Sequence, residues 1–170
     1  MNQWRRTAAL AAVLSILAVA SVLFYRHLES LSNPSATSVA LNRLDGPGSK
    51  RLSDWHGTPL VVNLFASWCP ACLTEMPAFE SVSHDYAGRI AVVGVDTRDS
   101  PSAGLSLARR LGVTYPLFSD TERAELYAAF GGQGMPVTAF IDRDGNVKQV
   151  YSGELNGALL RQLIDKLLQT

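Results

Sequence analysis

The chain holds only two cysteines in 170 residues, and both lie in the segment Trp68–Cys72 (WCPAC). A disulfide between them would close a very small loop and remove little entropy from the unfolded chain. We therefore do not expect it to serve mainly to stabilise the fold. The apolar run Leu60–Ala66 shortly before the pair has the composition of a strand buried on both faces. A Cys-x-x-Cys between a buried strand and a helix is typical of a reversible dithiol/disulfide couple. The pattern therefore predicts a redox site in an α/β fold.

The N-terminal segment predicts the compartment. Arg5 and Arg6 precede an uncharged, largely apolar stretch at 7–25, which as a helix would span roughly 28 Å, close to a bilayer core. We expect residues 1–28 to anchor the chain in a bacterial cytoplasmic (inner) membrane by a single transmembrane helix, with the C-terminal domain on the periplasmic side. A cleavable signal peptide ending near Ala18–Ala20 is the alternative. In both cases the dithiol is exported and needs an electron supply to stay reduced.

The remaining chain suits one domain. Residues 29–40 are expected to form a polar linker, and residues 41–170 are long enough for a single core. Fifteen basic and fifteen acidic residues leave zero formal charge with no basic stripe, so nucleic acid is a poor candidate partner. No second cysteine pair or clear Cys–His spacing is present, which disfavours a structural zinc site. No cofactor is expected.

Short apolar runs alternate with helical patterns along this domain. Strands are expected as follows, the first two forming an N-terminal β-hairpin: 41–44, 50–52, 60–66, 90–95, 117–118, 137–142 and 147–153. Helices are expected at 69–86, 102–111, 121–130 and 156–169. Thr121 or Asp120 would cap the third helix, and Pro77 predicts a kink in the first. The element order predicts a mixed central sheet flanked by helices.

The start of the first helix gives the two cysteines different roles. Cys69 would lie where unpaired backbone N–H groups and the helix dipole favour a thiolate, so we expect it to be the nucleophile. Cys72, one turn further in, would resolve the mixed disulfide. Glu75 lies three residues after Cys72 on a neighbouring part of the helix face. Partial burial would raise its pKa and let it take up the proton of the resolving thiol; an ordinary solvated glutamate is the alternative.

Two motifs far apart in the sequence carry a family resemblance: 61–77 (VVNLFASWCPACLTEMP) and 134–142 (GMPVTAFID). Together with the tail at 153–168, they resemble the membrane-anchored thioredoxin-like thiol-disulfide oxidoreductases of the TlpA/ResA/CcmG type. The resemblance implies a thioredoxin-like fold with Pro136 in cis facing the dithiol. It also implies a reductase role in making c-type cytochromes or handling other extracytoplasmic thiols. An acidic residue at the position of Glu75 is typical of the family.

Four further residues have predicted roles around the dithiol. Trp68 would shield the couple and offer an apolar contact surface, with a core role as the alternative. Met135–Pro136 would expose backbone for pairing with an extended substrate, and Met135 would present a soft side chain. A trans Pro136 in a plain turn is the alternative. Asn63 occupies the position of the buried aspartate of cytoplasmic thioredoxins; an amide does not titrate, and we expect it to bond to backbone.

Several charged residues are expected to lie on solvated faces, namely Arg98, Asp99, Arg109, Arg110 and Arg123.

The predicted function is reduction of protein disulfides outside the cytoplasm. The expected partners are a disulfide-bearing protein, such as apocytochrome c or a copper-site assembly protein, and a membrane thiol protein that donates electrons. A disulfide-forming oxidant is a first alternative, although 95–136 leaves no space for the extra helical domain common in such oxidases. A Cu(I) carrier using the two thiolates and Met135 is a second.

Overall fold

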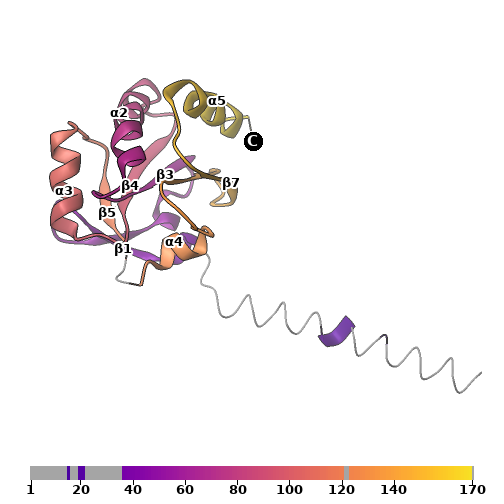
Figure 1. Cartoon of the computed structure of the whole chain (residues 1–170). Helices are drawn as coiled ribbons and strands as arrows, with labels where there is room; N and C mark the ends of the chain where they lie inside the picture. The colour runs from indigo at the N-terminus through magenta and orange to yellow at the C-terminus, as the bar shows by residue number, and fades with distance from the viewer. Residues whose placement is uncertain (1–14, 16–18, 22–35, 121–122, 170) are drawn as a thin grey trace, which may run out of the picture. The chain divides into compact units, whose positions relative to one another are not determined.

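The computed structural model describes residues 15, 19–21, 36–120 and 123–169 (Figure 1). The chain divides into two units, 1–34 and 35–170, and the fold below is that of the second. The expected anchor at 1–28, apart from the few residues named above, lies outside the described part of the chain. Within that part, no helix is long and apolar enough to cross a membrane.

A mixed sheet forms the centre of the described domain. Its seven strands there follow the order β2-β1-β5-β4-β3-β6-β7. The strands are β1 (Ala40–Arg43), β2 (Ser49–Arg51), β3 (Leu60–Phe65), β4 (Ala91–Asp96), β5 (Leu117–Ser119), β6 (Val137–Ile141) and β7 (Val147–Ser152). β3, β4 and β5 run parallel, and the other neighbouring pairs are antiparallel. The predicted mixed sheet and N-terminal hairpin are confirmed.

Helices cover both faces of this sheet. They are α2 (Pro70–Asp85), α3 (Pro101–Arg110), α4 (Glu125–Ala129) and α5 (Gly157–Leu167), with short 3-10 turns at Ala36–Ser38 and Leu52–Trp55. Every residue of β3 is buried, and its side chains alternate between two apolar clusters. One cluster, with Val61 and Phe65, packs against α2, α3 and α5; the other, with Val62 and Leu64, packs against α4. α2 and α5 lie side by side (Figure 1).

The parallel register brings two loops together at one edge of the sheet. β3 and β4 pair in register from Leu60 with Ala91 to Phe65 with Asp96, so both strands end at the same level. The chain leaving β3 leads into α2, and the chain leaving β4 leads into α3. Segments about thirty residues apart in the sequence therefore meet beside the start of α2, as expected where neighbouring parallel strands end.

The predicted helix at 121–130 is wrong in its extent, because α4 begins only at Glu125. Ala124 before it has a φ of +51°, a left-handed conformation that cannot continue a right-handed helix. Asp120 caps α4 as predicted, although it does not directly precede the helix. Its carboxylate accepts hydrogen bonds from the first-turn N–H groups of Leu126 and Tyr127, at 3.1 and 3.0 Å. Thr121, the other predicted cap, lies outside the described residues.

Candidate functional site

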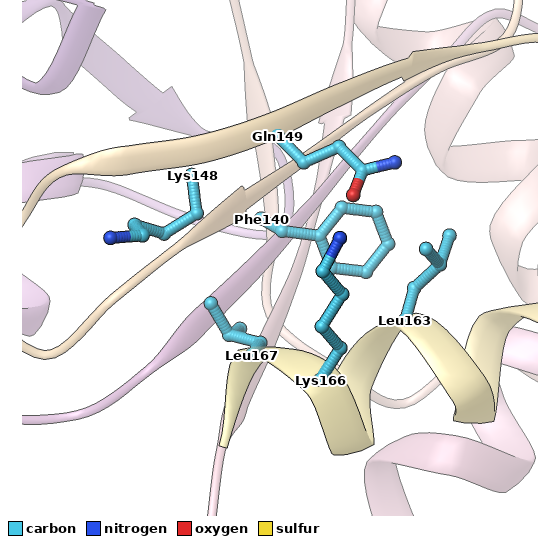
Figure 2. Close-up of a pocket in the computed structure, with 6 residues that line it drawn as sticks. All are labelled: Phe140, Lys148, Gln149, Leu163, Lys166 and Leu167. Atoms are coloured by element: carbon cyan, nitrogen blue, oxygen red, sulfur yellow. The ribbon is translucent and has the colours of Figure 1, made fainter. Parts of the chain in front are cut away.

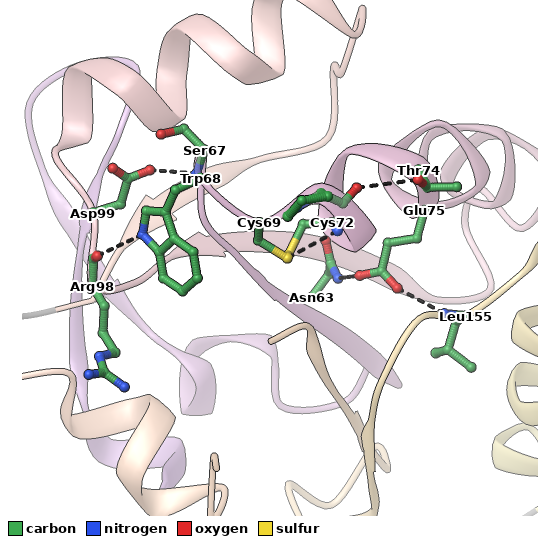
Figure 3. Close-up of a disulfide and its surroundings, with 11 residues drawn as sticks. Asn63, Ser67, Trp68, Cys69, Cys72, Thr74, Glu75, Arg98, Asp99 and Leu155 are labelled. Carbon is green, nitrogen blue, oxygen red and sulfur yellow. Dashed lines mark hydrogen bonds between the residues drawn. A yellow bond between two sulfur atoms is a disulfide. The ribbon is translucent and has the colours of Figure 1, made fainter. Parts of the chain in front are cut away.

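The two cysteines form a disulfide at the start of α2 (Figure 3). Cys69 is the N-cap residue, and its Sγ accepts a hydrogen bond from the Cys72 N–H at 3.1 Å. Pro70 occupies the first turn of the helix, where a missing N–H costs little. Cys69 keeps 3% of its surface exposed, whereas Cys72 keeps 0%. A nucleophile from solvent therefore reaches Cys69, and the helix start that favours a Cys69 thiolate is present as predicted.

Glu75 lies on the buried side of α2, with only 1% of its surface exposed. Its two carboxylate oxygens have different partners, which Figure 3 shows. Oε1 accepts from Asn63 Nδ2 at 2.7 Å, and Oε2 accepts from the Leu155 N–H at 2.9 Å. Burial raises the pKa of Glu75 to about 7, although both hydrogen bonds act to lower it. The solvated-glutamate alternative is wrong, and the carboxyl can exchange a proton near neutral pH.

Asn63 does not bond to backbone as expected; its amide binds the Glu75 side chain. Sequence reasoning missed this pair because the two residues are twelve positions apart on different elements. Among the described residues, Asn63 Oδ1 has no hydrogen-bond partner. A half-turn of the amide would exchange its donor and acceptor and offer Oδ1 to a protonated Glu75. Asn63 can therefore match either protonation state of the carboxyl.

Trp68 is 55% exposed, so the alternative of a core role is wrong. Its indole Nε1 donates to the backbone carbonyl of Arg98 at 3.0 Å (Figure 3). One residue earlier, the Ser67 N–H donates to Asp99 Oδ2 at 2.5 Å, while Asp99 Oδ1 accepts from the Ser100 N–H. The expectation that Asp99 is merely solvated is therefore wrong. The loop after β4 holds the segment that leads to Cys69.

A second buried carboxyl belongs to Asp96, at the end of β4, and sequence reasoning did not single it out. Burial raises the pKa of Asp96 to about 7, and the neighbouring Asp99 carboxylate adds to this effect. Gly104 of α3 packs directly on it, since a Cβ at Gly104 would lie 2.4 Å from the Asp96 carboxyl. The only sequence signal was an acidic residue at the end of an apolar strand run. Such a residue is just as compatible with an exposed strand end.

The Met135–Pro136 peptide bond is cis, so the trans alternative is wrong. β6 begins at Val137, which pairs with Leu64 of β3. Continuing this antiparallel register brings Met135–Pro136 beside the end of β3, from which the chain leads to the cysteines. Met135 is half-buried, and no hydrogen bond from its backbone is found among the described residues. Its N–H and C=O are thus free to pair with an extended chain, and the substrate-binding role of both residues stays a prediction.

Figure 2 shows a hollow between β6, β7 and α5 that contains none of the predicted site residues. Its volume is about 90 Å³, below the roughly 300 Å³ at which small-molecule pockets begin. Its lining residues are Phe140, Lys148, Gln149, Leu163, Lys166 and Leu167. We assign it no ligand.

Comparisons with known proteins agree with this geometry. The Redoxin family profile matches residues 31–164. The thiol:disulfide interchange protein DsbE of Escherichia coli K12 is 27% identical over 177 residues, covering 96% of this chain and 94% of that protein. The thiol-disulfide oxidoreductase ResA of Geobacillus thermodenitrificans is 25% identical over 134 residues, covering 78% and 76%. The solved structure of MTB dsbF, in mixed oxidized and reduced forms, matches with a TM-score of 0.72 and 26% identity, covering 79% of this chain and 98% of that one. The predicted thioredoxin-like fold is confirmed.

Proposed function

Since this chain belongs to the Redoxin family and is a thiol-disulfide oxidoreductase of the ResA/DsbE type, we propose that it reduces protein disulfides on the outer face of a cytoplasmic membrane. The observation that carries the proposal is the Cys69–Cys72 disulfide with the carboxyl of Glu75 buried behind it. The proposed substrates are apocytochrome c or a copper-site assembly protein. Residues 1–28 would serve as the anchor, and residues 41–170 as the working domain.

The first step is attack by the reduced protein. The Cys69 thiolate, favoured by the Cys72 N–H and the start of α2, attacks one sulfur of the substrate disulfide. The substrate S–S bond breaks, and its second sulfur leaves as a thiolate that takes a proton from solvent. The new bond is a mixed disulfide between Cys69 and the substrate.

The second step releases the substrate. The Cys72 thiol gives its proton to ionised Glu75, and the resulting thiolate attacks Cys69 Sγ. The mixed disulfide breaks, and the remaining substrate sulfur leaves and takes up the proton held by Glu75. Two electrons have then passed to the substrate, and the protein holds the disulfide observed here. A dithiol protein of the membrane would reduce the pair again.

Trapping in cells tests this function. In a Cys72→Ser variant the mixed disulfide on Cys69 cannot be resolved, so the substrate stays covalently attached. We expect adducts with exported proteins that carry paired cysteines, and no adduct when Cys69 is also changed to serine. Absence of any adduct in the single variant would contradict the proposal. Adducts confined to cytoplasmic proteins would contradict the proposed location.

The reduction potential separates a reductase from the oxidant alternative. A value near that of thioredoxin, about −270 mV, supports reduction, whereas a value near about −120 mV would favour disulfide formation. Protease added to spheroplasts tests the location independently, because an exported domain at 41–170 should be degraded while a cytoplasmic one is protected.

A further inference from the structure

An open groove lies beside Trp68, between the loop after β4 and α4. Its volume is about 410 Å³, within the range of sites that take small ligands or a short peptide segment. Its lining residues are Arg98, Arg123, Ala124, Tyr127, Ala128 and Gly132. Two of these carry guanidinium groups, and among the described residues no acidic side chain lines the groove. The prediction that Arg98 and Arg123 simply lie on solvated faces is therefore incomplete, because they share one concave surface.

Arg98 joins this groove to the redox site. Its backbone carbonyl accepts the Trp68 indole hydrogen bond at 3.0 Å, and Trp68 directly precedes Cys69. Its guanidinium carbon lies 5.6 Å from the centre of the Tyr127 ring, within the range of a cation–π contact. Figure 3 shows the Arg98 side chain extending away from the disulfide. The φ of Arg98 is +56°, a conformation that residues other than glycine rarely adopt.

The two arginines of the groove, Arg98 and Arg123, form no direct ion pair with a described residue. Asp99, the acid next to Arg98, is already engaged by two backbone N–H groups. The protein as a whole carries zero formal charge, so this patch does not reflect a generally basic surface.

We propose that this groove binds an acidic segment of the protein substrate, close to the substrate cysteine that Cys69 attacks. The inference rests on the proposed reductase function and names the substrate class for the same site. Arginine binds carboxylates through paired, charge-assisted hydrogen bonds, and the exposed Trp68 ring adds apolar contact area. An extended peptide advances about 3.3 Å per residue, so an acidic residue a few positions from the attacked cysteine can reach Arg98.

Peptide kinetics with the full chain test this specificity, with the Cys69–Cys72 pair reduced beforehand so that it supplies the two electrons. Three disulfide peptides would differ only in two residues a few positions from the attacked cysteine, which are both Glu, both Gln or both Lys. We expect kcat/KM for the Glu peptide to exceed that for the Gln peptide about three- to tenfold, through KM, and the ratio to fall at high salt. Arg98→Asp combined with Arg123→Glu should make the Lys peptide the preferred one. Aspartate is chosen at position 98 because it tolerates a left-handed backbone.

A matched control applies the same change of charge elsewhere. Arg109→Glu with Arg110→Glu alters two exposed arginines of α3, and it should preserve the preference for the Glu peptide. Retention of the native circular dichroism spectrum shows that each variant is folded. Equal kcat/KM for all three peptides in the wild-type chain would overturn the inference. Loss of the preference in the α3 control would also overturn it, because overall charge would then explain the effect.

A binding measurement separates failure of the groove from failure of the reductase function. Calorimetric titration of the full chain uses the Glu peptide with serine in place of both cysteines, so no redox step is involved. Binding that is lost in the Arg98→Asp, Arg123→Glu variant supports the groove even if no peptide is reduced, and only the proposed function would then fail. Reduction of the Gln peptide without any preference for Glu would refute the groove and leave the reductase function standing.

Discussion

Replacing Glu75 by glutamine removes the buried carboxyl behind the cysteines while keeping its size. The pKa of Glu75 is about 7 in the folded protein, against an ordinary value of 4.5. This difference, about 7 minus 4.5, corresponds to about 3–4 kcal/mol at roughly 1.4 kcal/mol per pKa unit. The folded state binds this proton more tightly than the unfolded state does. The stability that the group contributes is therefore complete below about pH 4.5, falls as the pH rises towards 7, and is lost above it.

Glutamine can keep hydrogen bonds to the same two partners, although Asn63 Nδ2 then occupies the place where Oδ1 now has no partner. Its carbonyl oxygen can accept the Leu155 N–H, and its amide can donate to Asn63 Oδ1 after a half-turn of the Asn63 amide. We therefore expect Glu75→Gln to fold and to keep the Cys69–Cys72 disulfide. In the wild type, Glu75 lowers the free energy of unfolding by about 3–4 kcal/mol as the pH rises from 4.5 to about 8, and the variant should lack this decrease.

Two measurements check this prediction. Urea unfolding of the oxidised chain across that pH range gives the stability difference between variant and wild type. Stopped-flow resolution of a mixed disulfide on Cys69 should be about a hundredfold slower in Glu75→Gln near neutral pH, since the proton acceptor is missing. Asp144→Asn, the same replacement of a carboxylate by an amide at an exposed turn position, is the control and should change neither quantity. An identical pH dependence of stability in Glu75→Gln and the wild type, or an unchanged rate of resolution, would refute the reasoning.

Three further substitutions test the surroundings of the site. Gly104→Ala should destabilise the protein by about 1–3 kcal/mol in urea unfolding, because the new Cβ would meet the Asp96 carboxyl at 2.4 Å. A variant as stable as the wild type would contradict this close packing. Asn156→Ala should lower the free energy of unfolding by about 1 kcal/mol, because it removes the side-chain N-cap of α5. Redox rates should not change. Unaltered stability would contradict the capping role. Trp68→Ala should change the free energy of unfolding little, because the ring is exposed, yet raise KM for a protein substrate; an unchanged KM would exclude the contact role.

Local signals in the sequence determined much of the fold and the centre of the site. A continuous apolar run predicted β3, because a strand covered on both faces can bury every side chain. The position of Cys69 shortly after the buried strand predicted the start of α2, and the structure has Cys69 as the N-cap with Pro70 in the first turn. Such features depend on residues a few positions apart, which the sequence states directly. The predicted extent of the helix at 121–130 was wrong because nothing in the sequence signals the left-handed backbone of Ala124. The composition of this segment otherwise favours a helix.

The tertiary structure alone decided how the redox couple is surrounded. Glu75 is paired with Asn63 from β3 and with the Leu155 N–H, eighty residues away, because α2 packs over the sheet and against the segment before α5. Nothing in the neighbours of Glu75 distinguishes this buried carboxyl from a solvated one. The hydrogen bond between Trp68 and the Arg98 carbonyl has a similar origin. Because β3 and β4 pair in parallel, the loops that follow them lie at the same edge of the sheet. The sequence thus determined which sulfur chemistry is present. Packing between distant segments decided the pKa of the Glu75 carboxyl, because burial sets how much water surrounds it, and it brought Arg98 and Arg123 to one surface.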